Sequence, residues 1–320
     1  MYRLGIDLGG TNIAVGIVDR ENNIVKKGSI PTNTGSPKEG IDPDAVVKSI
    51  AEVCNKVLEE ANILLCQIEF AGIASPGAID PENGIVTRAT NLNMINFPIV
   101  KKLRELLPVK KIIVENDANA AALGEAVAGS GMGVDKFIMV TLGTGVGGGI
   151  IIDGKIYSGF NYAGGELGHM VIEHNGRQCG CGRRGCWETY SSATGLINIT
   201  KEYMINNRNS IMWQMVENNI DKVSGKTAYK AAAMGDMTAR AVCAEYTDYL
   251  ACGLVNIINI FQPEILSIGG GVSNEGENLM APLRELVDKL QFTSNAAKKT
   301  QLKIASLKND AGIIGAASLE

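Results

Sequence analysis

The stretch Leu4-Gly-Ile-Asp-Leu-Gly-Gly-Thr-Asn-Ile-Ala-Val-Gly-Ile-Val-Asp19 places a pair of glycines between two runs of apolar, β-forming residues. Apolar runs interrupted in this way predict a strand, a tight turn and a second strand. A related pattern returns at Phe137-Ile-Met-Val-Thr-Leu-Gly-Thr-Gly-Val-Gly-Gly-Gly-Ile-Ile-Ile-Asp153. The second stretch therefore predicts another element of the same kind.

The two stretches align with each other residue by residue. When Asp7 is aligned with Thr141, Gly9 falls opposite Gly143 and the runs on both sides stay in register. Similarity at such a long spacing indicates a duplicated supersecondary unit and not a short-period solenoid.

Strands and helices alternate along the rest of the chain. Apolar residues at helical spacing predict a helix at residues 44–61, and short apolar runs predict strands at 68–74, 111–115 and 265–268. A short helix rich in glycine and alanine is expected from about residue 310. This alternation indicates an α/β protein.

The composition is that of a globular enzyme. The 320 residues, of which 45% are apolar and 20% charged, are enough for about two domains with buried cores. The net charge of −4 shows no basic footprint for nucleic acid or an anionic membrane. Neither a membrane span nor a signal peptide is recognisable. We therefore expect a cytoplasmic protein with no nucleic-acid or membrane partner.

Three of the seven cysteines lie within eight residues, and both histidines of the chain lie just before them. Cys179, Cys181 and Cys186 with His169 make a donor set that suits tetrahedral, structural Zn²⁺. His174 is an alternative fourth ligand, ranked lower because it lies in an expected turn. The competing interpretation is a group of buried or redox-active thiols.

Glycine clusters are the second candidate site. Glycine in a tight turn lets backbone N–H groups approach a phosphate, and a carboxylate beside the turn can hold hydrated Mg²⁺. Each turn alone could be an ordinary hairpin, but three clusters together favour a nucleotide. The candidate residues are Asp7, Gly9, Gly10, Thr11, Gly143, Thr144, Gly145, Gly269, Gly270 and Gly271.

Several carboxylates and amides form the third candidate site. Asn116 and Asp117 follow a strand, where functional groups of open α/β sheets project. Glu166 and Glu188 flank the cysteine loop, and Asn91 lies in an earlier polar loop. Such groups can hold sugar hydroxyls, and one carboxylate can take a proton from an attacking hydroxyl. The alternatives are helix capping for Asp117 and surface ion pairs for the glutamates.

These motifs together resemble the ROK family of sugar kinases and regulators, and within it the bacterial glucokinases. The resemblance covers nearly the whole chain. It rests on Asp7-Leu-Gly-Gly-Thr11, Glu115-Asn-Asp-Ala-Asn-Ala120, Leu142-Gly-Thr-Gly-Val-Gly-Gly-Gly149, Gly165-Glu-Leu-Gly-His169, Cys179-Gly-Cys-Gly-Arg-Arg-Gly-Cys186-Trp-Glu188 and Gly269-Gly-Gly271.

The resemblance implies an actin-like, RNase H-like ATPase fold with two domains around a cleft. We expect a small domain at 1–120, joined by a C-terminal helix at 309–320, and a large domain at 121–308. The implied reaction transfers the γ-phosphoryl group of ATP to glucose, with Mg²⁺ at the phosphates and a structural Zn²⁺. The implied roles are catalytic base for Asp117 and sugar binding for Asn91, Asn116, Asp117, Glu166, His169 and Glu188.

Some alternatives stay open. The sugar could be mannose, N-acetylmannosamine, N-acetylglucosamine or fructose, and polyphosphate could replace ATP as the donor. A sugar sensor without catalysis is the non-enzyme alternative. A DNA-binding regulator is disfavoured, because the first glycine hairpin begins at residue 4 and leaves no room for a preceding helix-turn-helix. The family also suggests a homodimer or a higher homo-oligomer.

Overall fold

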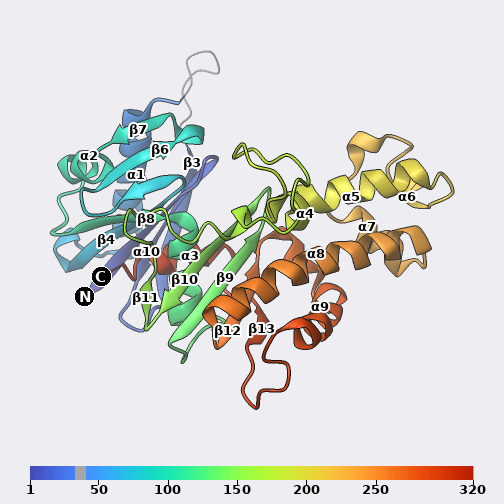
Figure 1. Cartoon of the computed structure of the whole chain (residues 1–320). Coiled ribbons are helices and arrows are strands. Elements are labelled where there is room, and N and C mark those ends of the chain that lie inside the picture. Colours follow the sequence, from blue (N-terminus) through green and yellow to red (C-terminus); the bar gives the residue numbers. More distant parts are fainter. Residues whose placement is uncertain (33–40, 320) are drawn as a thin grey trace. The chain divides into compact units, whose positions relative to one another are not determined.

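The computed structural model describes residues 1–32 and 41–319, which form two compact units (Figure 1). The first unit consists of Met1–Phe137, Gly149–Gly165 and Ser306–Glu320, and the second of Ile138–Gly148 and Glu166–Ala305. The units are thus interleaved along the chain. Residue 120, where the sequence suggests a boundary, lies inside a helix of the first unit.

The first sheet has the strand order β3-β2-β1-β4-β8. Strand β1 pairs antiparallel with β2 and parallel with β4, and β4 pairs parallel with β8. The carboxyl ends of β1, β4 and β8 therefore lie at one edge of the sheet. The strands are β1 (Tyr2–Leu8), β2 (Asn12–Val18), β3 (Ile24–Pro31), β4 (Ile68–Ser75) and β8 (Ile112–Asn116).

The second sheet, β11-β10-β9-β12-β13, repeats this order with the next set of strands. The bounds of β9 and β10 are those of β1 and β2 shifted along the sequence by the same number of residues, as the aligned stretches predict. The fold is therefore an α/β fold with a duplicated strand–hairpin–strand unit. The strands are β9 (Lys136–Leu142), β10 (Val146–Ile152), β11 (Lys155–Ile156), β12 (Ile265–Gly269) and β13 (Gln301–Ile304).

A third, small sheet and the helices complete the two units. The small sheet has the order β5-β6-β7, with β5 (Ala78–Asp80), β6 (Ile85–Ala89) and β7 (Met94–Phe97). The helices are α1 (Pro43–Ala61), α2 (Ile99–Leu106), α3 (Asp117–Ala128), α4 (Glu188–Ser191), α5 (Ala193–Asn206), α6 (Met212–Met215), α7 (Thr227–Ala233), α8 (Met237–Phe261), α9 (Glu277–Leu290) and α10 (Ala311–Ala316). Within the described residues, no helix is long and apolar enough to cross a membrane.

Helix α1 shows how the sequence sets an element of the first unit. Asp42 accepts a hydrogen bond from the Asp44 N–H (3.0 Å), Pro43 takes the first helical position, and Asn62 ends the helix in the left-handed conformation. Its apolar face packs against the first sheet, where Leu4 and the other inward side chains are fully buried. This face supplies the periodicity that predicts the helix.

The short helix α10 lies in the centre of the first unit, against β1, β4 and α3. All six of its residues are buried. The approach is so close that a methyl group at Gly5, Gly72 or Gly124 would overlap a carbonyl oxygen of the α10 segment. Backbone therefore packs directly on backbone, which only glycine permits at these positions.

Gly124 provides a test of this packing. Alanine normally favours a helix interior over glycine by about 1 kcal/mol, but here its methyl group would overlap the carbonyl oxygen of Ala311. We expect Gly124→Ala to lower the free energy of unfolding by about 1–3 kcal/mol in urea titrations. Gly225→Ala is the control, since nothing lies within 4 Å of the added atom. A Gly124→Ala variant as stable as the control would contradict the close packing.

Candidate functional site

The amino end of α3 carries Asp117 and is held by several hydrogen bonds. Asn116 is the N-cap: its Oδ1 accepts from the N–H groups of Ala118 (2.9 Å) and Asn119 (3.2 Å). The Asn116 Nδ2 donates to the carbonyl oxygen of Gly77 (3.0 Å), just past β4. Asp117 thus occupies the first turn of a helix whose N-cap residue is hydrogen-bonded both to the helix itself and to the segment after β4.

Glu115 supports this turn from the buried side and was not among the candidate site residues, although it begins one of the quoted motifs. Its Oε1 accepts from the Asn116 N–H (2.8 Å) and from the Asn119 Nδ2 (3.0 Å), and Glu115 and Asn119 are both buried. A glutamate directly before a capping asparagine, at the end of a buried strand, is the signal that could have identified it.

The first glycine hairpin lies between β1 and β2 in the same unit. The Gly9 N–H donates to the carbonyl oxygen of Asn12 (2.9 Å), and the Thr32 hydroxyl donates to that of Gly9 (2.7 Å). An added methyl group at Gly10 would come within 3.1 Å of the Asn91 side chain. Asn91 therefore lies beside the hairpin that the sequence assigns to phosphate.

Asp7, at the end of β1, has an unusual carboxyl group. Burial raises the pKa of Asp7 to about 6, and the nearby Asp117 carboxylate adds to the rise. Helix α10 covers the group, because a methyl group at Gly312 would lie 2.7 Å from it. A hydrated divalent cation such as Mg²⁺ prefers oxygen ligands and would compensate the charge of these two carboxylates.

The second unit holds the other two glycine clusters, next to each other. In the hairpin, the Ala193 N–H donates to the carbonyl oxygen of Gly143 (2.8 Å), and the Thr194 hydroxyl donates to that of Thr144 (2.8 Å). Gly270, with a φ of 84°, lies so close to β9 that a methyl group would come within 2.5 Å of the Leu142 carbonyl oxygen. The structure thus brings these two clusters together.

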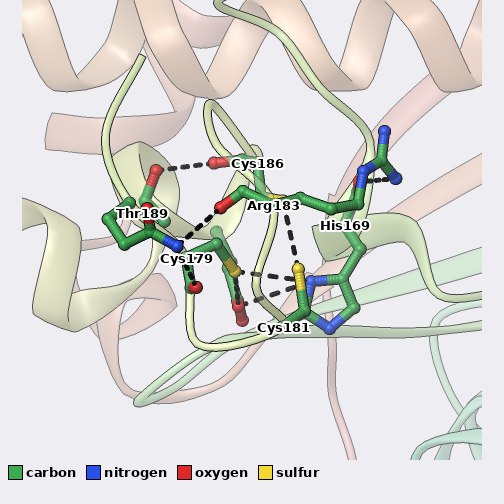
Figure 2. Close-up of polar contacts among 8 residues, drawn as sticks. His169, Cys179, Cys181, Arg183, Cys186 and Thr189 are labelled. Carbon is green, nitrogen blue, oxygen red and sulfur yellow. Dashed lines mark hydrogen bonds and ion pairs between the residues drawn. The ribbon is translucent and has the colours of Figure 1, made fainter. Parts of the chain in front are cut away.

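The cysteine loop gathers four possible metal ligands in the second unit (Figure 2). The ligand atoms of His169, Cys179, Cys181 and Cys186 all lie within 4.8 Å of one another. Cys179 Sγ is 3.7 Å from His169 Nδ1, and the Sγ atoms of Cys181 and Cys186 are 3.6 Å apart. His174 is exposed and lies outside this group.

These distances fit zinc. Ligands bound tetrahedrally at zinc–ligand distances of about 2.0–2.3 Å lie roughly 3.5–3.8 Å from each other. The loop returns sharply on itself, with the Cys179 N–H donating to the carbonyl oxygen of Arg183 (2.9 Å) and with Gly182 at a φ of 90°. The cluster is therefore compatible with a closed, structural zinc site.

Glu188 links this cluster to the second hairpin. Its Oε1 lies 3.0 Å from Cys179 Sγ and 3.5 Å from His169 Nδ1, and its Oε2 would be 2.6 Å from a methyl group at Gly145. The neighbouring Trp187 is fully buried and donates from Nε1 to the carbonyl oxygen of Tyr249 in α8 (3.0 Å). This anchor fixes the position of Glu188.

The remaining sugar-site candidate, Glu166, is exposed at the start of the turn that carries His169. The His169 N–H donates to its carbonyl oxygen (3.1 Å). Among the candidates for sugar binding, the first unit therefore contains Asn91, Asn116 and Asp117, and the second contains Glu166, His169 and Glu188.

The duplicated sheets with glycine hairpins define an α/β protein with the actin-like ATPase fold. The chain belongs to the ROK family, whose model matches residues 3–320. A glucokinase from Thermotoga maritima is 39% identical over 99% of this chain and 96% of its own length.

Two further relatives show the range of the family. A crystal structure of a ROK family glucokinase from Streptomyces griseus, in complex with glucose and AMPPNP, has a TM-score of 0.78 and 31% identity, and the match covers 99% of this chain and 98% of that one. A xylose repressor from Caldicellulosiruptor bescii is 29% identical over 98% of this chain and 76% of its own length.

The cysteine cluster leads to a metal prediction. We expect elemental analysis of the purified protein to find about one zinc ion per chain, because the four donors fit one closed tetrahedral site. Cys181→Ser should lower the zinc content. Cys66→Ser, at an exposed cysteine elsewhere, should not change it. A metal-free preparation with full stability and activity would exclude a structural zinc.

Asp7 leads to a prediction about pH. Because its folded-state pKa of about 6 exceeds the ordinary value of 3.8, ionisation of Asp7 destabilises the folded state as pH rises through 6. Asp7→Asn should therefore raise the free energy of unfolding at pH 8 without divalent cations, by up to about 3 kcal/mol. The gain should shrink as the pH falls from 6 to 4.

Asp19→Asn is the matched control for Asp7→Asn. Its pKa is lowered by hydrogen bonds from Asn23, so its removal should give no stabilisation at pH 8. Unfolding of all three proteins in urea at several pH values makes the comparison. Equal stability of Asp7→Asn and the unsubstituted protein at pH 8 would show that the ionised Asp7 carboxylate does not destabilise the folded state.

Proposed function

We propose that the protein is an ATP-dependent hexose kinase that phosphorylates glucose to glucose 6-phosphate. The observation that carries this proposal is the location of Asp117 and Asp7 at the same edge of the first sheet, next to the first glycine hairpin, which would provide a proton acceptor near a candidate Mg²⁺ and phosphate site. The glucokinase relatives and the glucose and AMPPNP bound to the Streptomyces griseus enzyme support the choice of substrates.

In the proposed reaction, Asp117 accepts the proton of the glucose 6-hydroxyl as that oxygen attacks the γ-phosphorus and ADP leaves. The Asn116 side chain caps the helix turn that carries Asp117, and the Glu115 carboxylate accepts a hydrogen bond from the Asn116 N–H. Mg²⁺ bound near Asp7 would neutralise charge on the phosphate oxygens. The backbone N–H groups at Gly9, Gly10, Thr11 and the second hairpin would hold those oxygens.

The other proposed sugar ligands are Asn91, Glu166, His169 and Glu188, whose carboxylate, amide and imidazole groups suit hydroxyls. His169 presents Nδ1 to the cysteine cluster, which leaves Nε2 for the sugar. Zinc bound there would fix the tautomer of His169 and order the loop that carries Glu188. We also propose a cytoplasmic location and a homodimer or higher homo-oligomer, which stay predictions.

A second candidate function follows from the repressor relatives, which match nearly the whole of this chain. These relatives are named as xylose repressors and not as kinases. A kinase for mannose, fructose or an N-acetylated amino sugar, or a sugar-binding protein without catalysis, is therefore the alternative. The sugar panel below separates these possibilities.

The test is ADP release from Mg²⁺-ATP with glucose, mannose, fructose, N-acetylglucosamine and N-acetylmannosamine supplied one at a time. We expect the highest rate with glucose. In Asp117→Asn turnover should disappear while glucose still binds in calorimetry, because asparagine can still hydrogen-bond a sugar hydroxyl but cannot accept its proton. Asp221→Asn, at an exposed carboxylate of the second unit, is the control and should keep its rate.

The possible outcomes are distinct. Preference for another sugar would keep the mechanism and change the substrate. An Asp117→Asn variant with a tenth of the original rate would contradict its role as the base. Sugar binding without turnover, with either ATP or polyphosphate, would favour the sensor.

A further inference from the structure

Tyr190 joins the two ends of the cysteine loop. It lies in α4, two positions after Glu188, and is only 3% exposed. Its hydroxyl oxygen accepts a hydrogen bond from the Arg177 N–H (2.8 Å). Arg177 lies two positions before Cys179, so this one bond closes the segment that contains all three clustered cysteines.

The Arg177 side chain adds to this closure. Its guanidinium carbon lies 4.8 Å from the centre of the Tyr190 ring, a distance at which a cation is attracted to the face of an aromatic ring. The same group donates to the carbonyl oxygen of Thr189 (3.4 Å) and to the Glu202 carboxylate of α5 (2.7 Å). The arginine therefore holds Tyr190 and the residue before it.

The backbone of the loop is fitted closely around the Tyr190 hydroxyl. A methyl group at Gly176 would lie 2.2 Å from the hydroxyl oxygen, so a side chain at this position would displace the ring. The carbonyl oxygen of Arg177 accepts from the Gly185 N–H (2.8 Å), next to Cys186. The peptide groups on both sides of Arg177 are thus hydrogen-bonded to the far end of the loop.

Helix α8 contributes a second aromatic ring to the same contact. The ring centres of Tyr190 and Tyr249 are 4.5 Å apart, with the planes tilted by 35°, and such pairs stabilise beyond the burial of their area. The Tyr249 carbonyl oxygen also accepts from Trp187 Nε1 (3.0 Å). Tyr249 therefore holds one residue on each side of Glu188.

The helix that carries Glu188 is too short to hold its own position. Helix α4 has four residues, and a single helical turn has too few internal hydrogen bonds to be stable alone. Its place is therefore set by its contacts, of which Tyr190 makes those to Arg177 and Tyr249. A shift of about 1 Å in a group that orients a substrate is enough to lose much of its effect.

We propose that Tyr190 is a positioning residue for the hexose site, which places Glu188 for a sugar hydroxyl by fastening α4 to Arg177 and Tyr249. The proposal rests on the proposed function, because that function makes Glu188 a sugar ligand. Tyr190 itself does not contact the sugar in this role. Zinc would hold the loop at its cysteines, and Tyr190 holds it at its two ends.

Calorimetric titration of the zinc-containing protein with glucose tests this role. Tyr190→Phe keeps the ring and removes the acceptor of the Arg177 N–H, so the affinity for glucose should fall about threefold to tenfold. The KM for glucose should rise by the same factor while kcat and the KM for ATP stay unchanged, the pattern of lost substrate binding. The zinc content should not change.

Tyr203→Phe is the matched control. Its hydroxyl donates to the Glu245 carboxylate (2.7 Å), between α5 and α8, so the variant also loses one tyrosine hydrogen bond beside α8. The affinity of this variant for glucose should equal that of the unsubstituted protein. A merely structural role of Tyr190 would lower the melting temperature and leave the affinity of the folded protein for glucose unchanged.

A double-mutant cycle with Glu188→Ala shows whether Tyr190 acts through Glu188. Once the Glu188 side chain is absent, Tyr190→Phe should weaken glucose binding less than about twofold, because the group that it positions is gone. Arg177→Lys keeps the backbone N–H and loses the guanidinium contacts. It should give a smaller loss of glucose affinity with the same dependence on Glu188.

Unchanged glucose affinity in folded Tyr190→Phe would overturn the positioning role. Losses that multiply in the double variant would overturn it too, and so would loss of zinc from Tyr190→Phe, because the tyrosine would then act on the metal ligands. If hexoses are still phosphorylated in these cases, the proposed function survives without this role. If glucose binds and the cycle shows coupling but no hexose is phosphorylated, the positioning role stands and the proposed reaction fails.

Discussion

The direct packing of the α10 backbone on β1, β4 and α3 is the constraint on which the first unit depends. Glycines at the contacts let carbonyl groups approach the sheet and the helix without side chains between them. The parallel order β1-β4-β8 places Asp7 and Asp117 at the same edge of the first sheet, and α10 covers Asp7 there through Gly312. A helix distant in sequence therefore contributes to the burial that raises the pKa of Asp7.

Features encoded by local patterns could be predicted from the sequence. The two glycine hairpins, their duplication and the helix at Pro43–Ala61 follow from apolar spacing and from turn residues, and the structure confirms all three. The cysteine loop is also local, because three of its four ligands lie within eight residues. Its glycines permit the tight loop, so residue types alone indicate which side chains converge.

Features that depend on contacts distant in sequence could not be predicted. Glu115 looks like any strand residue until the Asn119 amide is seen next to it. The first unit extends past residue 120 for the same reason, because the rest of α3 has its packing partner, α10, at the other end of the chain.

The position of α10 also has a consequence for how the first unit folds. Its packing on β1 joins Gly5 to Ile313, which lie far apart in the sequence. Contacts between such distant residues form slowly, because the long loop between them must close before the contact stabilises the chain. We therefore expect the docking of α10 to be a late step in the folding of the first unit.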